Sequence, residues 1–199
     1  NGLEEVRHVF LNGNKLSNRL NNGFKIAELG FGTGLNFLST LWLWRLKKQK
    51  GKIFYTSFEA FPLQPIEMLK AQNEFPELSD LKDEFYSLWS TLLEKGELSG
   101  NDYNLRLILG DARRTINQFD TLVDCWFLDG FSPAKNPELW EEDLLKNVYR
   151  CTADGGTLST YSAAGYVRRN LSLAGFQVER ISGFGRKRHM TIALKNDEK

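Results

Sequence analysis

The stretch Glu28-Leu29-Gly30-Phe31-Gly32-Thr33-Gly34-Leu35-Asn36 decides the fold class of this 199-residue chain. The short apolar run 26–29 predicts a strand that leads into it, and the apolar run 35–46 predicts a helix that follows. Three alternating glycines allow a tight turn and a close approach of the backbone to a ligand. This strand–loop–helix unit is typical of an open α/β sheet, in which ligands bind at the carboxyl ends of the strands.

The loop spacing, G-x-G-x-G, differs from the G-x-G-x-x-G pattern of dinucleotide-binding enzymes, and no Lys-Ser or Lys-Thr pair of a P-loop follows. Glu28 precedes the glycines, and a carboxylate there disfavours a pyrophosphate and suits a cation. S-adenosylmethionine carries an ammonium and a sulfonium, so it is the candidate ligand on grounds of charge. A tight strand-to-helix turn without a ligand is the alternative interpretation.

From Lys25 onward, predicted strands and helices alternate. The strands are 26–29, 53–58, 105–109, 123–128 and 157–161; the helices are 35–46, 65–73, 78–94, 112–118, 137–150 and 163–174. Two further strands, 175–181 and 190–194, follow each other without a helix, so one of them should run antiparallel. The prediction is a doubly wound α/β sheet, mostly parallel, with an antiparallel last strand and helices on both faces.

The N-terminal residues 5–20 predict a hairpin, because a mostly apolar run, 6–11, is followed by the turn residues Asn12-Gly13-Asn14 and a polar return. The chain is therefore divided into a hairpin extension, residues 1–22, and one α/β domain, residues 23–199. A length of 199 residues suits a single domain with a substantial core.

Composition excludes several classes of protein. The chain is 41% hydrophobic and 26% charged, and no apolar run approaches the roughly 20 residues that a membrane helix needs. Cys125 and Cys151 lie in apolar contexts and are expected to be core residues, and neither His8 nor His189 belongs to a ligand-spaced cluster. We expect a cytoplasmic protein without a metal site. The first residue is not Met, so a missing N-terminal segment stays open.

Two further acids follow predicted strands. Glu59 ends the second strand, where a carboxylate can accept both hydroxyls of a ribose. Asp111 follows the third strand, where its side chain can meet an adenine amino group; a helix cap before Ala112 explains it equally well. Together with Glu28, these acids at the ends of three successive strands predict a nucleoside pocket.

The fourth strand ends at Asp129, which should point into the crevice beside the cofactor. The residues expected to shape an acceptor pocket after it are Phe131, Pro133, Lys135 and Trp140. A loop that only caps the next helix is the alternative. Basic residues gather at 113–114, 168–169 and 186–188, where they are either a rim for a polyanion or solvated surface, and the net charge of +1 gives no overall field.

The sequence resembles the methyltransferase domain of the tRNA 5-methylaminomethyl-2-thiouridine biosynthesis (MnmC) family and its stand-alone relatives. The resemblance covers essentially the whole chain, and FLDGFSPAKNP is highly specific to the family. The matching stretches are NGLEEVRHVFL, ELGFGTGLNF, FEAFPL, GDAR, FLDGFSPAKNPELW and GFGRKRHM.

The resemblance implies a Rossmann-like class I methyltransferase fold, S-adenosyl-L-methionine as cofactor, and N-methylation of an aminomethyl group on the wobble uridine of tRNA. Asp129 falls on the catalytic position. The residues that we assign to the cofactor are Glu28, Gly30, Gly32, Gly34, Asn36, Glu59, Asp111, Ala112 and Asp129. The residues that we expect to meet the phosphates of the anticodon loop are Arg168, Arg186, Lys187 and Arg188. The oxidase domain of the bifunctional members is absent, so we expect no FAD-dependent oxidase activity, and a separate FAD oxidase acting upstream stays open.

Three rival functions stay open. A methyltransferase of a small-molecule amine keeps the acids but needs no basic rim. A nicotinamide-dependent oxidoreductase is disfavoured by the loop spacing. A catalytically silent tRNA-binding module would keep the fold without methyl transfer.

Overall fold

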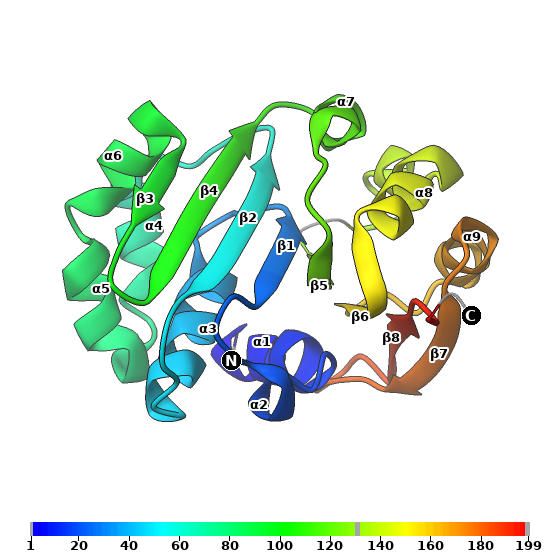
Figure 1. Cartoon of the computed structure of the whole chain (residues 1–199), viewed down its shortest axis with the longest axis horizontal. Coiled ribbons are helices and arrows are strands. Elements are labelled where there is room, and N and C mark those ends of the chain that lie inside the picture. The colour runs from blue at the N-terminus through cyan, green and yellow to red at the C-terminus, as the bar shows by residue number, and fades with distance from the viewer. Residues whose placement is uncertain (1, 130–131, 198–199) are drawn as a thin grey trace.

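The computed structural model describes residues 2–129 and 132–197 and contains one eight-stranded sheet in the order β3-β4-β2-β1-β5-β6-β8-β7 (Figure 1). The strands are β1 Lys25–Leu29, β2 Ile53–Glu59, β3 Glu97–Ser99, β4 Tyr103–Leu109, β5 Val123–Leu128, β6 Thr152–Thr160, β7 Gln177–Ser182 and β8 His189–Leu194. The α-helices are α1 Gly2–Val6, α2 Leu16–Arg19, α3 Leu35–Leu46, α4 Pro65–Gln72, α5 Ser79–Phe85, α6 Leu88–Lys95, α7 Ala112–Thr115, α8 Glu142–Arg150 and α9 Gly165–Ala174. The other helical turns are η1 Arg7–Asn12, η2 Pro76–Leu78, η3 Ile116–Gln118 and η4 Pro137–Trp140.

The sheet is parallel from β4 through β2, β1 and β5 to β6. The last strand, β8, runs antiparallel to both β6 and β7, which confirms the predicted topology. The short edge strand β3, which pairs antiparallel with β4, was not predicted. Helices α3 to α6 lie on one side of the sheet and α7 to α9 on the other (Figure 1).

Two hydrophobic cores lie on opposite faces of the sheet because successive strand residues point to opposite sides. On β1, Ile26 belongs to the core that contains α3, whereas Ala27 and Leu29 belong to the core that contains α8 and α9. The alternation also orients Glu28, which shares the face of Ile26 and therefore points toward α3. This orientation decides the role that Glu28 can play.

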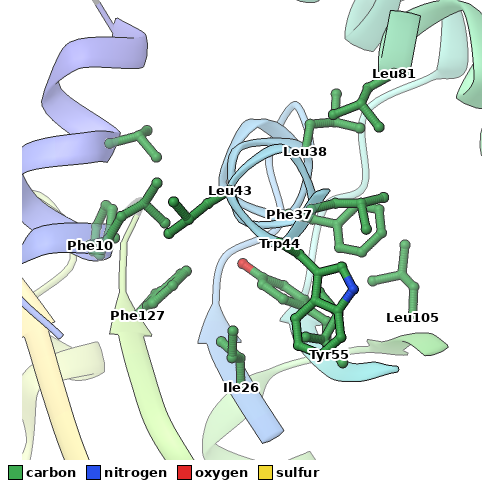
Figure 2. Packing of buried hydrophobic residues seen from close by; sticks show 14 of the residues in the cluster. Phe10, Ile26, Phe37, Leu38, Leu43, Trp44, Tyr55, Leu81, Leu105 and Phe127 are labelled. Carbon is green, nitrogen blue, oxygen red and sulfur yellow. The ribbon is translucent and has the colours of Figure 1, made fainter. Parts of the chain in front are cut away.

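Helix α3, which begins directly after the glycine loop, is buried on nearly all sides. Figure 2 shows it end-on, with Leu43 turned toward Phe10 and Phe127 and with Leu38 turned toward Leu81. Phe37 packs edge-on against Tyr55 of β2, with ring centroids 5.3 Å apart. The first turn of α3 is thereby held rigidly over the carboxyl ends of β1 and β2.

The predicted N-terminal hairpin is wrong. Residues 2–12 and 16–19 are helical, as α1, the π-helical turn η1 and α2, and a turn at 13–15 joins them. Leu3, Val6 and Phe10 recur at helical spacing and are buried in the core around α3, so the predicted strand 6–11 is helical instead. Asn14 is fully buried within the turn, and its amide donates to Ser159 Oγ of β6 over 2.7 Å.

Two predicted helices are interrupted. The stretch 78–94 divides into α5 and α6 at Tyr86, and the stretch 137–150 divides into η4 and α8 because Glu141 is extended. Within 2–129 and 132–197, no helix has the length and apolar character to cross a bilayer. Over the same residues, no cluster of His, Cys, Asp or Glu forms a metal site, and both cysteines are buried free thiols.

Candidate active site

A cavity of about 680 Å³ lies at the carboxyl ends of the central strands. The glycine loop, the segment after β2, the first turn of α7, and residues 136–139 form its walls, and Val6 of α1 closes one side. The predicted site residues that line it are Gly30, Gly32, Asn36, Glu59, Asp111, Ala112 and Asp129. The ends of β2, β4 and β5 thus deliver the acids Glu59, Asp111 and Asp129 to one cavity, as the sequence predicted, and the first turn of α3 adds Asn36.

The glycines of the loop have different roles. Gly32 has φ +52°, and a Cβ added there would meet nothing within 4 Å, so its backbone faces open space and can approach a ligand. Gly34 has φ +75° and does not line the cavity; a Cβ there would lie 3.3 Å from Phe31 Cζ and 3.4 Å from Trp89. Gly34 therefore serves packing and the left-handed turn into α3.

Glu59 stabilises the glycine loop. Its Oε2 accepts hydrogen bonds from the backbone N–H groups of Phe31, at 2.9 Å, and Gly32, at 3.1 Å. Its Oε1 accepts from the backbone N–H of Phe61 over 2.8 Å. Both acceptor sites of Oε2 are therefore occupied, whereas Oε1 keeps one site that can still accept a hydroxyl from the cavity.

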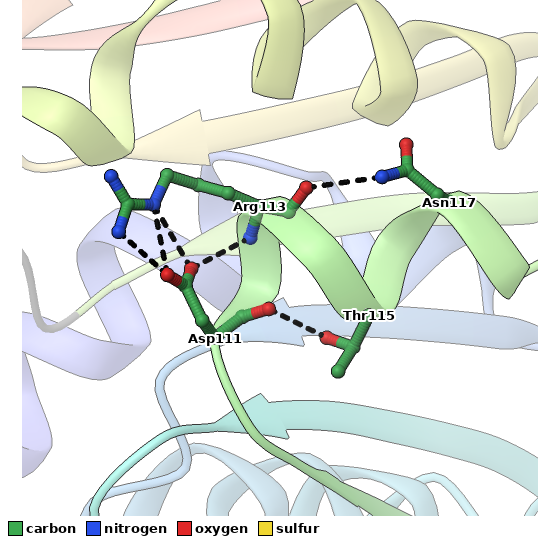
Figure 3. A network of polar contacts seen from close by, with 4 residues as sticks. All are labelled: Asp111, Arg113, Thr115 and Asn117. Atoms are coloured by element: carbon green, nitrogen blue, oxygen red, sulfur yellow. Dashed lines mark hydrogen bonds and ion pairs between the residues drawn. The ribbon is translucent and has the colours of Figure 1, made fainter.

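Asp111 caps α7, which confirms the cap interpretation (Figure 3). Its carboxylate accepts from the backbone N–H of Arg113 over 3.0 Å, and the Arg113 guanidinium binds both carboxylate oxygens, the shortest contact being 2.6 Å. The Arg113 guanidinium holds the pKa of Asp111 below its ordinary value. The carboxylate still borders the cavity, with its charge shared by Arg113.

Asn36, in the first turn of α3, joins two carboxylates. Its Nδ2 donates to Glu28 Oε1 and to Asp129 Oδ2, each over 2.7 Å. Asn36 and Asp129 line the cavity, whereas Glu28 is 1% exposed and does not. The expectation that Glu28 meets the ligand directly is therefore wrong; Glu28 acts from behind Asn36 because strand alternation turns it toward α3.

Burial raises the pKa of Glu28 well above its ordinary value, and the negative charge of Asp129 raises it further, against an opposing contribution from the Asn36 hydrogen bond. Hydrogen bonding from the nearby Ser57 and Tyr55 hydroxyls also lowers the pKa of Glu28, but burial outweighs these contributions. A protonated Glu28 is the form that this apolar surrounding favours.

The cavity suits a cationic nucleoside such as S-adenosylmethionine. Gly32 leaves space for close backbone approach, and the acids Glu59, Asp111 and Asp129 line the cavity. Apolar residues complete the lining, among them Phe31 and the 87%-exposed Phe61. Hydrogen-bond acceptors, negative charge and apolar surface thus border one cavity, as a ribose, a cation and a base require.

The structure places several residues of the predicted acceptor pocket outside the cavity. Trp140 is 1% exposed and packs in the core around α8, so it is not an aromatic wall of the cavity. Pro133 and Lys135 do not line the cavity; the Pro133 carbonyl accepts from the Tyr166 hydroxyl over 2.8 Å, and Lys135 is exposed in a turn. Phe131 lies outside the described residues. The residues that do line this side are Asn136, Glu138 and Leu139.

The basic residues that were expected to meet phosphates, at 168 and 186–188, lie outside the cavity lining, whereas Arg113 lines it. Arg186 and Arg188 are exposed in the turn between β7 and β8, while Arg168 is half-buried near Ala163 on α9. Lys187 forms an ion pair with Glu5 of α1, and its ammonium lies 4.0 Å from the centre of the Tyr161 ring. The Lys187 ammonium therefore already has two partners within the protein, Glu5 and Tyr161.

Several lining residues were missed from the sequence. Phe61 lies two residues after the predicted Glu59, and Arg113 directly follows the predicted Ala112, so a local signal for both was present. Val6 was not, because only tertiary packing brings α1 to the cavity.

Comparisons with known proteins agree with this geometry. Residues 73–196, more than half of the chain, match a family described as S-adenosyl-L-methionine-dependent methyltransferases. The chain is 42% identical to the tRNA 5-methylaminomethyl-2-thiouridine biosynthesis bifunctional protein MnmC of Leptospira interrogans, over 99% of this chain and 32% of that protein. It is 40% identical to the protein of the same name from Marinomonas sp., over 98% of this chain and 30% of that protein.

The chain thus spans about a third of the length of the curated relatives it matches. Among solved structures, MNMC2 from Aquifex aeolicus is similar with a TM-score of 0.77 and 26% identity, over 96% of this chain and 59% of that one. Spermidine synthase from Thermotoga maritima, with a TM-score of 0.55 and 11% identity over 97% of this chain and 59% of that one, shares the fold alone.

Proposed function

Because this chain belongs to the S-adenosyl-L-methionine-dependent methyltransferase family, we propose that it methylates the amine of an aminomethyl group on the wobble uridine of tRNA. The product is methylaminomethyluridine, or its 2-thio form. The observation that carries the proposal is the 42% identity, over 99% of this chain, to a protein named for this uridine modification. The placement of Asp129 in the same cavity as the glycine loop supports it.

Bound S-adenosylmethionine would supply a methyl group on a sulfonium sulfur. The acceptor nitrogen would take this methyl group with its lone pair, a neutral thioether would be released, and the nitrogen would then lose one proton. Glu59 and the backbone at Gly32 would hold the ribose, and Asp111 with Ala112 would border the adenine. Asn36 positions Asp129, and Glu28 positions Asn36.

Asp129 has two effects on the acceptor amine. If the amine titrates like a lysine, near a pKa of about 10.4, freeing its lone pair at pH 7 costs about 4 kcal/mol. A carboxylate beside it stabilises the ammonium and so opposes this step. We assign Asp129 to orienting the amine and accepting its proton, with in-line positioning providing most of the rate.

The same proposal implies partners. The tRNA anticodon loop is the macromolecular substrate, since its unstacked bases can enter a pocket. An upstream FAD oxidase would supply the aminomethyl precursor, and the enzyme would act in the cytoplasm with its tRNA.

The test is transfer of a labelled methyl group to tRNA that carries the aminomethyl wobble uridine, followed by nucleoside analysis. Label in methylaminomethyluridine is the expected result, and tRNA whose wobble uridine is unmodified is the control acceptor. Transfer to free small amines but not to tRNA would instead identify a small-molecule methyltransferase. Binding of tRNA without any transfer would identify a silent module.

A further inference from the structure

Tyr161 lies beside Asp129 at the carboxyl edge of the sheet. The parallel pair β5 and β6 places Phe127 opposite Ser159, and two residues further along each chain stand Asp129 and Tyr161. The two side chains are close enough for the Asp129 charge to act on the Tyr161 hydroxyl. Tyr161 was not among the predicted site residues, although it borders the place where the acceptor must meet Asp129.

The Tyr161 ring is half-buried, and one of its faces is covered by Lys187, whose Nζ lies 4.0 Å from the ring centre. The same ammonium is ion-paired with Glu5. The side chains of this ion pair are 45% and 33% exposed, for Lys187 and Glu5 respectively, so solvent weakens the attraction between them. An aromatic face is thus covered by a cation that is held only loosely.

The N-terminal helical segment anchors this arrangement. Besides the Glu5 contact, His8 Nε2 lies 3.1 Å from the Ser182 carbonyl, and the His8 ring lies 5.8 Å from that of Phe184 in the turn between β7 and β8. Val6, between Glu5 and His8, lines the cofactor cavity. The same short segment therefore borders the cavity and holds the basic turn that carries Lys187.

We propose that the Tyr161 ring is the surface on which the acceptor base stacks, and that Lys187, held by Glu5, covers this ring until a substrate phosphate takes the Glu5 position. This inference rests on the proposed function, because it assumes an RNA acceptor. Unstacked bases bind aromatic faces regardless of sequence, and a phosphate competes with a carboxylate for the same ammonium. Glu5 is then an internal competitor of the substrate.

The Tyr161 hydroxyl is not needed for this role. Burial and the charges of Asp129 and Glu5 raise the pKa of Tyr161 to about 12, so the hydroxyl stays protonated at neutral pH and cannot serve as a base. The ring alone should suffice, which makes Tyr161→Phe the informative conservative variant.

The first arm of the test measures the affinity of a labelled anticodon stem-loop RNA for the wild-type chain and for Glu5→Gln, without cofactor. Glu5→Gln should bind about two- to fivefold more tightly, the range of an exposed ion pair. The matched control is Glu142→Gln, which removes the acid of another exposed ion pair, Glu142–Lys146, and should leave the affinity unchanged. Glu5→Gln in a Lys187→Gln background should have no effect, since Glu5 acts through Lys187.

The second arm measures methyl transfer. Tyr161→Leu should lower kcat/KM for the RNA by about tenfold or more, as the removal of one stacking surface predicts, without changing KM for the cofactor. Tyr161→Phe should keep wild-type values. Equal decreases in both Tyr161 variants would overturn the stacking role.

The outcomes separate the two proposals. An increase in RNA affinity from Glu5→Gln that persists in the Lys187→Gln background would reflect net charge and overturn the Glu5–Lys187 mechanism. The same increase in Glu142→Gln would have the same meaning. If the wild type binds RNA and the variants have the same RNA affinity and kcat/KM as the wild type, this inference is overturned and the proposed function stands. Absence of RNA binding by the wild type overturns both.

Discussion

The Asn36 side-chain nitrogen lies 2.7 Å from Asp129 Oδ2, so the first turn of α3 holds the carboxylate that follows β5. The same nitrogen lies 2.7 Å from Glu28 Oε1 on β1. One amide therefore joins the cavity to a buried acid behind it. Each member of this group can be tested separately, because each has a different consequence for catalysis or stability.

Asp129→Asn should lower kcat by about 100-fold or more, the range expected when a proton acceptor is removed, because the amide cannot take the amine proton. The cofactor Kd should change by less than about threefold. Single-turnover methyl transfer and calorimetric cofactor binding check the two quantities. Asp120→Asn, which changes an acid 94% exposed, is the control. Full turnover by Asp129→Asn would refute the assigned role.

Glu59→Gln should weaken cofactor binding by about tenfold or more, because one acceptor oxygen becomes an NH₂ group that faces backbone N–H donors. The variant loses hydrogen bonds to either Phe61 or the pair Phe31 and Gly32. Calorimetry of cofactor binding measures the effect, with the exposed Glu94→Gln as control. Equal affinities for the wild type and Glu59→Gln would show that the loop does not depend on this carboxylate.

Glu28→Gln should raise the free energy of unfolding at pH 8 above that of the wild type. The folded-state pKa of Glu28 is raised, so its stabilising contribution is complete below the ordinary pKa and is lost as pH rises through the folded value. Gln stays neutral, and its amide can still form hydrogen bonds with the adjacent Tyr55 and Ser57 hydroxyls. Urea unfolding between pH 5 and pH 8 tests this prediction. A difference in unfolding free energy between Glu28→Gln and the wild type that does not decrease toward pH 5 would contradict it.

Arg113→Gln should raise the pKa of Asp111 toward its ordinary value, because the guanidinium is the main cause of the lowered pKa. A lowered folded-state pKa contributes stability above the ordinary value, and this stability is lost as pH falls through the folded one. The variant should therefore unfold at a higher pH during acid titration. Carboxyl NMR titration gives the pKa, and Arg114→Gln, whose effect on Asp111 is smaller, is the matched comparison.

Arg186→Glu combined with Arg188→Glu should weaken tRNA binding and lower the slope of log Kd against log salt concentration by about 1 for each phosphate that the turn no longer neutralises. Both residues are exposed in the β7–β8 turn. Lys47→Glu with Lys50→Glu, at the far end of α3, reverses the same number of charges elsewhere. A slope that both double variants lower equally would argue against a specific tRNA-binding role for the turn.

Local sequence features predicted much of the fold. The boundaries of α3 and β5 were predicted to the residue, since both are apolar runs flanked by clear breaks. Acids after β2 and β5 reached the cavity as expected, because the carboxyl ends of parallel strands meet at one edge. The N-terminal turn forms at 13–15, but the predicted strands beside it are helical, because Leu3, Val6 and Phe10 share one buried helix face.

By itself the sequence determined the glycine loop, the order of strands and helices, and the strand ends at which acids appear, because backbone preference and hydrophobic period act over a few residues. Tertiary structure alone decided that Glu28 faces α3, that Trp140 is buried in a core, and that Glu5, Tyr161 and Lys187 meet beside Asp129. These contacts join segments far apart in the chain, and they depend on packing across the sheet rather than on any local preference.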